Sequence, residues 1–252
     1  KLNDAKKLLE YCKKYGAVPF STIARLAFIA NVLLQGIPEI SNIKKHKIDE
    51  FMNSISTPVT EFQDDLVKLN QKNFSKKVFL LKYGHLRPGT YDITIQRYDK
   101  MPKFLDSFKF LDFDRPKKIK KISEKSLKKI LEKHELKFEE ISFFDFIIKT
   151  INLREKTKFE FTKTLSDAIE LIADAGEELG FSREELSYLS INEIFNLELS
   201  KKENIQKKWK KSILNNKREY FKNEFIELPP VIFSKNDFSV IPHYIAKPNY
   251  IT

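Results

Sequence analysis

The longest regular pattern in this sequence is a row of apolar residues spaced three and four apart between about Asn152 and Leu179. Such spacing places the residues on one face of an α-helix, because a helix completes a turn in 3.6 residues. Gly180 follows the last of them, as is common at a helix C-terminus. We therefore predict a long amphipathic helix whose buried face contains Phe161, Leu165, Ala168, Ile169, Ile172, Ala173 and Leu179.

Helix signals also dominate the rest of the chain. A first helix is expected to end at Gly16, and Ser21 can cap a second helix that ends at Gly36. The segment Ile23–Leu34 is apolar on most sides, so we expect it to be the central buried helix. Pairs in which Ser or Thr precedes Glu or Gln by three residues predict further helix starts at Thr60–Gln63, Ser182–Glu185, Ser190–Glu193 and Ser200–Glu203.

The order of these signals predicts a mainly α fold with a small extended or hairpin element near Tyr91–Tyr98. We expect a first helical subdomain in residues 1–116 and a second one, with the long helix, in residues 117–227. Residues 228–252 contain four prolines and few helix signals. They are predicted to be an extended linker towards a further domain.

Composition excludes several classes of protein. The single cysteine, Cys12, excludes a disulfide framework and a cysteine-built zinc site. The four histidines are scattered, so we expect no metal site. No apolar run reaches the 18–20 or so residues of a membrane span, and the chain starts with neither Met nor a secretory leader. We expect a cytoplasmic segment of a longer polypeptide, with no membrane partner.

A loop at Lys82–Arg97 gathers charged residues around a Pro-Gly turn. An ordered loop of this kind suits an anionic or polyoxygenated ligand, because arginine offers a forked set of donors to phosphate or carboxylate. The alternative is a surface turn whose tyrosines pack while its charges face water. The candidate binding residues are Lys82, His85, Arg87, Asp92 and Arg97.

A second candidate site is the pair Arg154 and Lys158 at the expected start of the long helix. Residues four apart are neighbours on one helix face, and this face continues into the apolar stripe. Cations at a helix N-terminus oppose the helix dipole, whereas a bound anion would satisfy both the free N–H groups and the cations. The alternatives are that the two side chains extend from the rim of the core into water or pair with Glu155 or Glu160.

The chain carries 46 Lys and Arg against 35 Asp and Glu, a formal net charge of +11. Two segments are strongly basic, Lys117–Lys133 and Lys201–Lys222. Their apolar residues have helical spacing, which predicts packed helices with solvated lysines; in the second segment the packing side is Ile205, Trp209, Ile213 and Leu214. A basic helical nucleic-acid-binding module is the alternative interpretation. No glycine-rich phosphate loop and no H-E-x-x-H zinc motif is present.

The stretch KYGHLRPGTYDITIQRYD, residues 82–99, resembles the Y-G-H-x-x-P-G-x-x-D-[IL] motif of proteins related to phosphoenolpyruvate synthase, pyruvate phosphate dikinase and rifampin phosphotransferase. Residues 24–34, ARLAFIANVLL, are similar to the helix that follows the ATP-grasp domain in that superfamily. LREKTKF, residues 153–159, is similar to its R-E-x-x-K helix. FSREELSYLSINEIFNL and the final KPNYIT resemble the segments that lead to its swivelling, histidine-bearing domain.

In that superfamily a histidine takes a phosphate from ATP and carries it to an acceptor. The resemblance implies that this chain is the acceptor-binding or linker domain of an ATP-dependent, phosphohistidine-type phosphotransferase. Such a domain is not expected to be catalytic alone, since ATP, magnesium, the ATP-grasp domain and the histidine domain belong to other parts of the parent chain. The resemblance further implies that Arg154 and Lys158 meet the incoming phosphate, and that the loop with His85, Arg87, Asp92 and Arg97 helps to shape the same site.

Two positions depart from the motif of many relatives. Thr90 replaces an acidic residue and Leu86 replaces an arginine. We therefore do not expect rifampin as the substrate but another small, hydroxyl-bearing acceptor. The remaining alternatives are the nucleic-acid-binding module and a purely structural spacer between moving domains.

Overall fold

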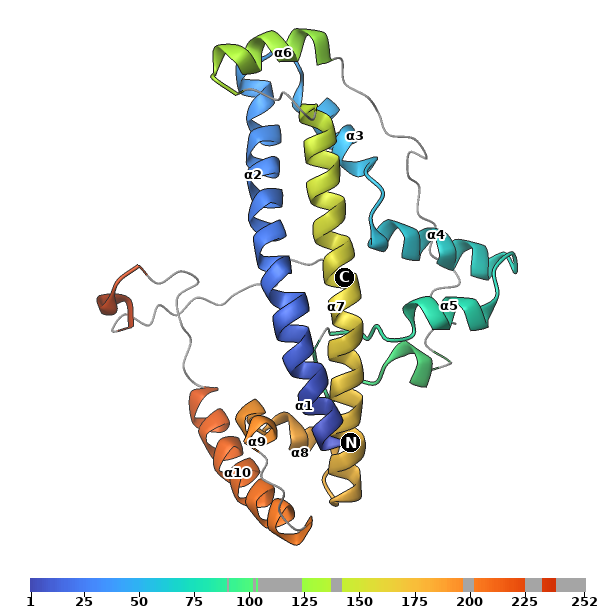
Figure 1. Cartoon of the computed structure of the whole chain (residues 1–252), viewed down its shortest axis with the longest axis vertical. Coiled ribbons are helices and arrows are strands. Elements are labelled where there is room, and N and C mark those ends of the chain that lie inside the picture. Colours follow the sequence, from blue (N-terminus) through green and yellow to red (C-terminus); the bar gives the residue numbers. More distant parts are fainter. Residues whose placement is uncertain are drawn as a thin grey trace. The chain divides into compact units, whose positions relative to one another are not determined.

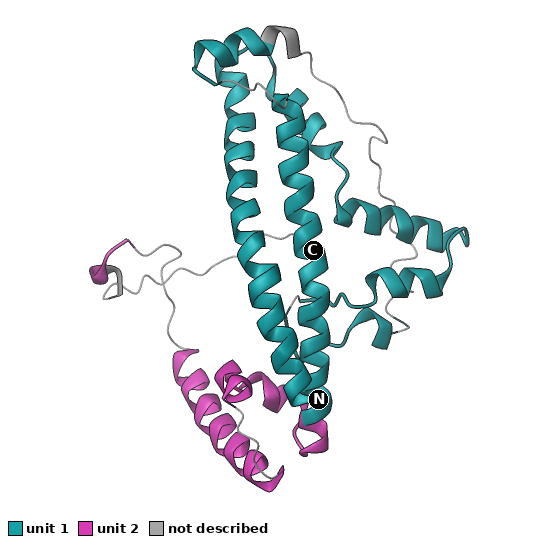
Figure 2. Ribbon diagram, in the orientation of Figure 1, with its two compact units in different colours: residues 1–175 teal, residues 176–252 magenta. Residues whose placement is uncertain are grey.

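The computed structural model describes residues 1–89, 91–101, 103, 124–136, 142–196, 202–224 and 233–238. These residues form helices and loops and no β-strand, which confirms the predicted mainly α fold (Figure 1). They belong to two compact units, residues 1–175 and 176–252 (Figure 2). The predicted boundary at 116/117 falls outside the described residues, and the described segments on its two sides belong to one unit.

The helices of the first unit are α1 (Leu2–Tyr11), the π-helix Cys12–Ala17, α2 (Val18–Ile40), α3 (Lys45–Asn53), α4 (Pro58–Asn70), α5 (Lys76–Tyr83), the 3₁₀ turn Tyr98–Lys100, α6 (Glu124–Lys133) and α7 (Phe143–Glu178), whose end crosses into the second unit. The second unit contains α8 (Arg183–Ser187), α9 (Ile191–Phe195), α10 (Lys202–Asn223) and the 3₁₀ turn Lys235–Phe238.

The two helices predicted at the N-terminus are one continuous helix, in which α1, the π-helix and α2 follow without a break. Gly16 does not end a helix, because it lies inside the π-helical segment. A Cβ atom at this position would lie 2.5 Å from Cβ of Phe161 on α7. Ser21 does not cap a helix either, and its hydroxyl donates to the Val18 carbonyl oxygen at 2.8 Å. Tertiary packing, rather than the local signal, therefore explains the glycine.

Helix α7 begins nine residues earlier than its apolar stripe suggested, at Phe143 instead of about Asn152. Ser142 precedes it, and its hydroxyl accepts a hydrogen bond from the Asp145 N–H at 3.2 Å. The helix lies beside α2 (Figure 1). The Phe20 and Phe161 rings are 5.3 Å apart, and Arg154 lies over Phe28. From the first contact to the second, the residue number rises on α2 and falls on α7. The two helices are therefore antiparallel.

One apolar cluster joins the far end of this helix pair to α3 and α6 and explains why the described residues on both sides of the predicted boundary, up to residue 175, form one unit. Residues from both sides of the predicted boundary are fully buried in it, namely Ala30, Leu34, Ile37, Ile48, Phe51, Ile55, Leu127, Leu131, Phe143, Phe144 and Ile147. A second cluster, Leu66, Phe79 and Tyr83, joins α4 to α5.

Helix α2 is not the buried central helix that its composition predicted. Only one face is buried, formed by Ala24, Ala27, Ala30, Leu34 and Ile37. Large apolar side chains on the opposite face remain exposed, and Val32 is 69% accessible. The helix Leu2–Ile40 is long and apolar enough to cross a membrane, with a mean hydropathy of 1.7 over an 18-residue window that is 22% buried. Core helices and signal sequences can meet the same criteria.

In the second unit, two of the predicted helix starts are confirmed. The Ser182 hydroxyl accepts from the Glu185 N–H while the Glu185 carboxylate accepts from the Ser182 N–H, and Ser190 caps α9. Ser200 and most of the tail 228–252 lie outside the described residues. In α4, Thr57 rather than Thr60 is the capping residue, because Pro58 occupies the first helical position, which proline favours.

We predict that Gly16→Ala destabilises the protein, because its methyl group meets the Phe161 side chain. Relief of the contact requires the two helices to separate, which is expected to lower the free energy of unfolding by about 1–3 kcal/mol. Gly36→Ala is the control, since a Cβ atom there has no neighbour within 4 Å. That change should be neutral or stabilise by up to about 1 kcal/mol. Urea unfolding of both variants measures the difference, and equal stability would contradict the packing described.

Candidate functional site

The charged loop follows α5 and folds back on itself without forming a β-strand. The Tyr98 N–H donates to the Leu86 carbonyl oxygen at 2.8 Å, and the Asp99 N–H donates to the Gly84 carbonyl oxygen at 3.1 Å. Gly89 and Tyr91 both have positive φ, 63° and 75°. The predicted extended or hairpin element near Tyr91–Tyr98 is therefore not a pair of β-strands. Two backbone hydrogen bonds and a tight turn hold the loop together instead.

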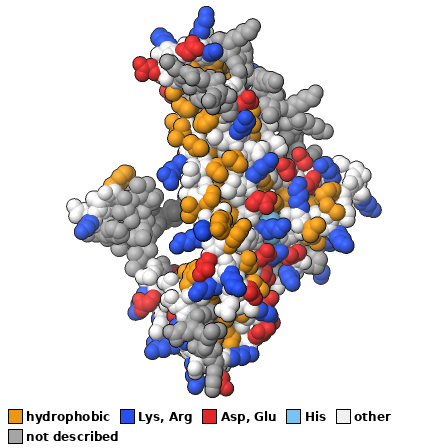
Figure 3. Space-filling view, viewed as in Figure 1, with side chains coloured by type: hydrophobic (Ala, Val, Ile, Leu, Met, Phe, Trp, Pro, Cys, Tyr) orange, Lys and Arg blue, Asp and Glu red, His pale blue; other side chains and the backbone are white. Residues whose placement is uncertain are grey.

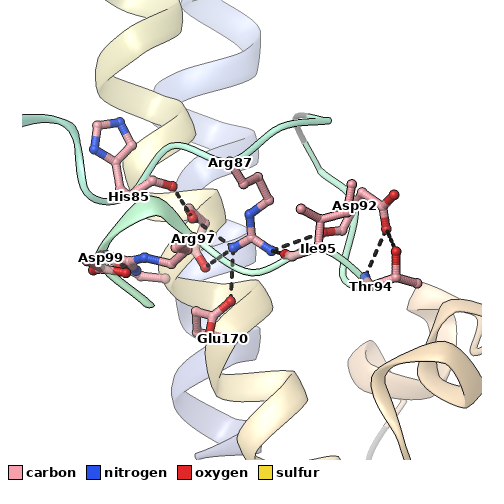
Figure 4. A network of polar contacts seen from close by, with 10 residues as sticks. His85, Arg87, Asp92, Thr94, Ile95, Arg97, Asp99 and Glu170 are labelled. Carbon is pink, nitrogen blue, oxygen red and sulfur yellow. Dashed lines mark hydrogen bonds and ion pairs between the residues drawn. The ribbon is translucent and has the colours of Figure 1, made fainter. Parts of the chain in front are cut away.

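Arg87 is the centre of the loop (Figure 4). Its guanidinium donates to the carbonyl oxygens of Asp92 and Ile95 at 3.0 and 3.1 Å. The same group donates to the hydroxyl of Ser166 and the carboxylate of Glu170 on α7, at 2.9 and 3.1 Å. The Arg87 side chain is only 3% accessible. It is therefore a buried clamp between loop and helix, with its charge balanced by Glu170.

Arg97 and Asp92 are also used within the protein. The Arg97 guanidinium pairs with Asp99 at 2.8 Å and with Asp167 on α7 at 2.5 Å. The Asp92 carboxylate accepts hydrogen bonds from the N–H and the hydroxyl of Thr94. The loop therefore brings the predicted residues together, but their polar groups stabilise the loop itself. Lys82, the fifth of them, pairs with Asp65 at 2.9 Å instead.

His85 differs from its neighbours because its ring has no polar partner. Its side chain faces away from the Arg87 guanidinium (Figure 4), and the ring packs edge-on against Phe159 with 4.9 Å between centroids. The residue is 3% accessible, and neither ring nitrogen has a hydrogen-bond partner in the described part of the chain. Burial, together with the nearby charges of Arg97 and Lys163, lowers the pKa of His85 to about 4. The ring is therefore neutral at pH 7.

A small cavity lies beside the loop, lined by His85, Leu86, Arg87, Tyr91, Thr162, Ser166 and Ile169. The volume that the centre of a water molecule can occupy in it is about 20 Å³. This space suits one water molecule, which needs roughly 10–15 Å³ on the same measure, and it is too small for a phosphorylated metabolite.

Arg154 and Lys158 do not lie at a helix N-terminus. Helix α7 starts eleven residues before Arg154, so the backbone N–H groups around the pair are inside the helix. The helix-dipole argument for an anion at this position is therefore wrong. What remains is the pair of side chains, one turn apart as predicted.

The surroundings of Arg154 nevertheless suit a ligand. Its guanidinium lies over the Phe28 ring of α2, 5.6 Å from the centroid, and pairs with Glu155 at 2.6 Å. Its Nε atom is buried and lacks a hydrogen-bond partner among the described residues. The Phe28 side chain is 62% exposed, and Lys158 is exposed as well. The pair thus lies where an exposed aromatic surface meets two cationic side chains.

The loop and the cation pair are two separate sites. The loop contacts α7 through Phe159, Ser166, Asp167 and Glu170. At about 100° per residue, these positions lie about 100–160° around the helix from the midpoint between Arg154 and Lys158. The resemblance implied one shared site, but the structure places the loop on one face of α7 and the pair on another.

Arg25 is a residue that the sequence analysis did not include in the site. In the antiparallel pair of helices it lies at the level of Lys156 and Thr157, between Arg154 and Lys158. It is exposed, and it precedes Phe28 by three residues. To predict that Arg25 lies near this pair, one must know how α2 and α7 align along each other. The two helices are more than a hundred residues apart in the sequence, so no local pattern gives this alignment.

Helix α10 carries the second basic segment. Trp209 and Ile213 are buried, as predicted, whereas Leu214 is 50% exposed and does not belong to the packing side. Lys208 pairs with Glu193, and the Lys217 ammonium lies over the Tyr188 ring. Of the other basic segment, only residues 124–133 are described. The nucleic-acid alternative remains a prediction.

In the described part of the chain, no three His, Cys, Asp or Glu side chains are grouped as metal ligands. Comparison of the chain with protein-family models, curated proteins and solved structures gives no match.

We predict that Arg87→Met destabilises the protein by about 3 kcal/mol, because removal of one member of a buried ion pair leaves its partner's charge poorly compensated. Glu170→Gln in the same chain should recover part of this loss, since the members of a pair do not act additively. Urea unfolding of the two single variants and the double variant measures the coupling. Strictly additive effects would contradict the clamp.

We predict that His85 makes stability fall as the pH is lowered from about 6.5 to about 4. In this range the unfolded histidine binds a proton that the folded, buried ring does not bind. The contribution approaches about 3 kcal/mol at the lower limit. It is measured as the difference between the pH dependences of unfolding of the wild type and of His85→Leu. Parallel curves would show that the ring titrates normally.

Proposed function

We propose that this chain is the acceptor-binding or linker domain of an ATP-dependent, phosphohistidine-type phosphotransferase resembling phosphoenolpyruvate synthase. The proposal rests on the motif at residues 82–99, on the R-E-x-x-K spacing of Arg154 and Lys158, and on the surroundings of that pair. The observation that carries it is the contact between the Arg154 guanidinium and the exposed Phe28 ring.

Phosphoryl transfer needs chiefly positioning and charge neutralisation. When the phosphoryl group passes from a histidine nitrogen to an acceptor hydroxyl, the P–N bond breaks, a P–O bond forms, and the hydroxyl proton ends on the histidine that is released. Negative charge is then spread over the three other oxygens. Arg154 and Lys158 would bind these oxygens, Arg154 through the terminal nitrogens of a side chain that is 34% accessible. Arg25, at the same level of the helix pair, would add a third positive charge.

The loop has a supporting role in this proposal. Arg87, Asp92 and Arg97 already have partners within the protein, and the cavity beside His85 suits only a water molecule. We therefore assign these four residues to holding the loop against α7 rather than to direct contact with the acceptor. The acceptor would be a small hydroxyl-bearing molecule that binds beside Phe28.

The proposal includes further parts outside this chain. ATP and magnesium would bind to an ATP-grasp domain, and the phosphate would arrive on a swivelling histidine domain of the same cytoplasmic polypeptide. The chain alone would not turn over ATP.

We predict that Arg154→Ala with Lys158→Ala lowers phosphoryl transfer by the complete enzyme at least 100-fold, because two charges that stabilise the transferring group are lost. The chain offers a matched control in Lys149→Ala with Lys156→Ala. Both lysines are exposed on α7, on the side opposite to Arg154. The measurement is transfer of labelled γ- or β-phosphate from ATP to protein and acceptor.

The control pair should retain nearly full transfer, and circular dichroism should show unchanged helix content in both double variants. Full transfer without Arg154 and Lys158 would refute their role. Equal losses in the two double variants would mean that overall charge, rather than this site, is responsible.

A further inference from the structure

The exposed face of α2 is the largest feature that the proposed function leaves unexplained. Five large apolar side chains on this face are exposed, and we call them the α2 strip. They are Val18 (58% accessible), Leu26 (44%), Ile29 (52%), Val32 (69%) and Ile40 (37%). Hydrophobic side chains are visible along this helix in Figure 3. Exposed apolar surface of this extent marks a binding surface.

The members of the α2 strip share one face of the helix, on which Arg25 and Thr22 are also exposed. The strip members are separated by three, eight or eleven residues, and at about 100° per residue they lie within about 60° of Ile29. The buried alanines lie on the other side of the helix. Arg25 lies within this face, about 40° from Ile29, and Glu39 and Gln35 follow beyond one edge of it, all three exposed.

Positive charge flanks the strip at both ends. Lys13 and Lys14 precede α2, and Lys44, Lys45 and Lys47 follow it. All five lysines are exposed. Within Val18–Ile43 the only charged residues are Arg25 and Glu39. An apolar face between two groups of lysines is complementary to a surface with an apolar interior and anionic groups at its boundary.

We propose that the α2 strip docks the protein onto an anionic lipid bilayer, with α2 lying in the plane of the interface. The apolar side chains would enter the boundary between headgroups and acyl chains, and the lysines would contact anionic headgroups. This inference goes beyond the proposed function, and it departs from the expectation that the protein has no membrane partner. Arg25 lies within the strip, and its long side chain would reach towards the headgroups while its methylene groups contact the apolar boundary.

The neighbouring helix argues for an interfacial position and against a membrane-spanning one. Over the length of the strip, α7 packs beside α2 and carries charged residues on several sides, among them Arg154, Glu155, Lys156, Lys158 and Glu160. A charged side chain at the centre of a bilayer is costly. A helix that brings these charges with it can lie on a bilayer but cannot cross it alone.

The test is flotation of the protein with large unilamellar vesicles of phosphatidylcholine with 30% phosphatidylglycerol, and with vesicles of phosphatidylcholine alone. The wild type should float with the anionic vesicles and bind the neutral ones at least tenfold more weakly. Ile29→Glu with Val32→Glu should weaken binding to the anionic vesicles at least tenfold.

Val78→Glu with Leu81→Glu is the matched control, because these side chains are also exposed and three residues apart, on α5. The control should bind as the wild type does, and circular dichroism should show that both double variants are folded. Equal binding by the strip variant and the wild type would overturn the proposal, as would absence of wild-type binding to anionic vesicles. Sedimentation that shows self-association lost in the strip variant, without vesicle binding, would assign the strip to a second copy and overturn it too.

The outcome is separable from that for the proposed function. Failure of vesicle binding removes the lipid partner but leaves phosphoryl transfer through Arg154 and Lys158 untouched. Conversely, normal vesicle binding together with full transfer by the Arg154→Ala, Lys158→Ala enzyme would refute the function and retain the docking surface.

Discussion

The close packing of α2 against α7 is the contact on which the rest of the first unit depends. The π-helical segment before α2 brings Gly16 against Phe161, where no Cβ atom fits. Ala24, Ala27 and Ala30 continue the small surface along α2. Small residues on one helix let the other approach closely, and the approach fixes their register. That register sets Arg154 over Phe28 and forms the surface against which α3, α6 and the charged loop pack.

The two groups of charged residues on α7 differ in how their charges are compensated. Around Arg87 the donors are matched by backbone carbonyls, a serine hydroxyl and Glu170, all in the interior, where an unmatched group would be costly. The Arg154 side chain is 34% accessible and pairs with the neighbouring Glu155, and Lys158 faces water. A buried arginine with several partners stabilises a fold, whereas accessible cations can bind a ligand. This contrast locates the candidate site on the α2 side of α7.

Much of the fold follows from the sequence, because helical spacing and capping residues are local. The buried stripe of α7 and the start of α8 at Ser182 are examples. The predictions that failed concern contacts between distant residues. Gly16 resembles a helix terminator in the sequence, because the contact with Phe161 that explains it is not visible there. The exposure of Val32 likewise depends on which face of α2 packs against other helices. Two of the loop residues, Arg87 and Arg97, bind partners on α7 that are about seventy or more residues away, namely Ser166, Asp167 and Glu170. Arg25 comes to the level of Arg154 and Lys158 only through the register of two helices.

The central claim is that an anionic group binds beside Arg154 and not beside Arg87. A titration of the protein with inorganic phosphate, followed through the side-chain ¹⁵Nε resonances of its arginines, tests it most directly. The account predicts a saturable shift of the Arg154 resonance, a smaller one for Arg25, and no change for the buried Arg87. A shift of Arg87, or no response from Arg154 up to phosphate concentrations that saturate exposed arginines, would contradict it.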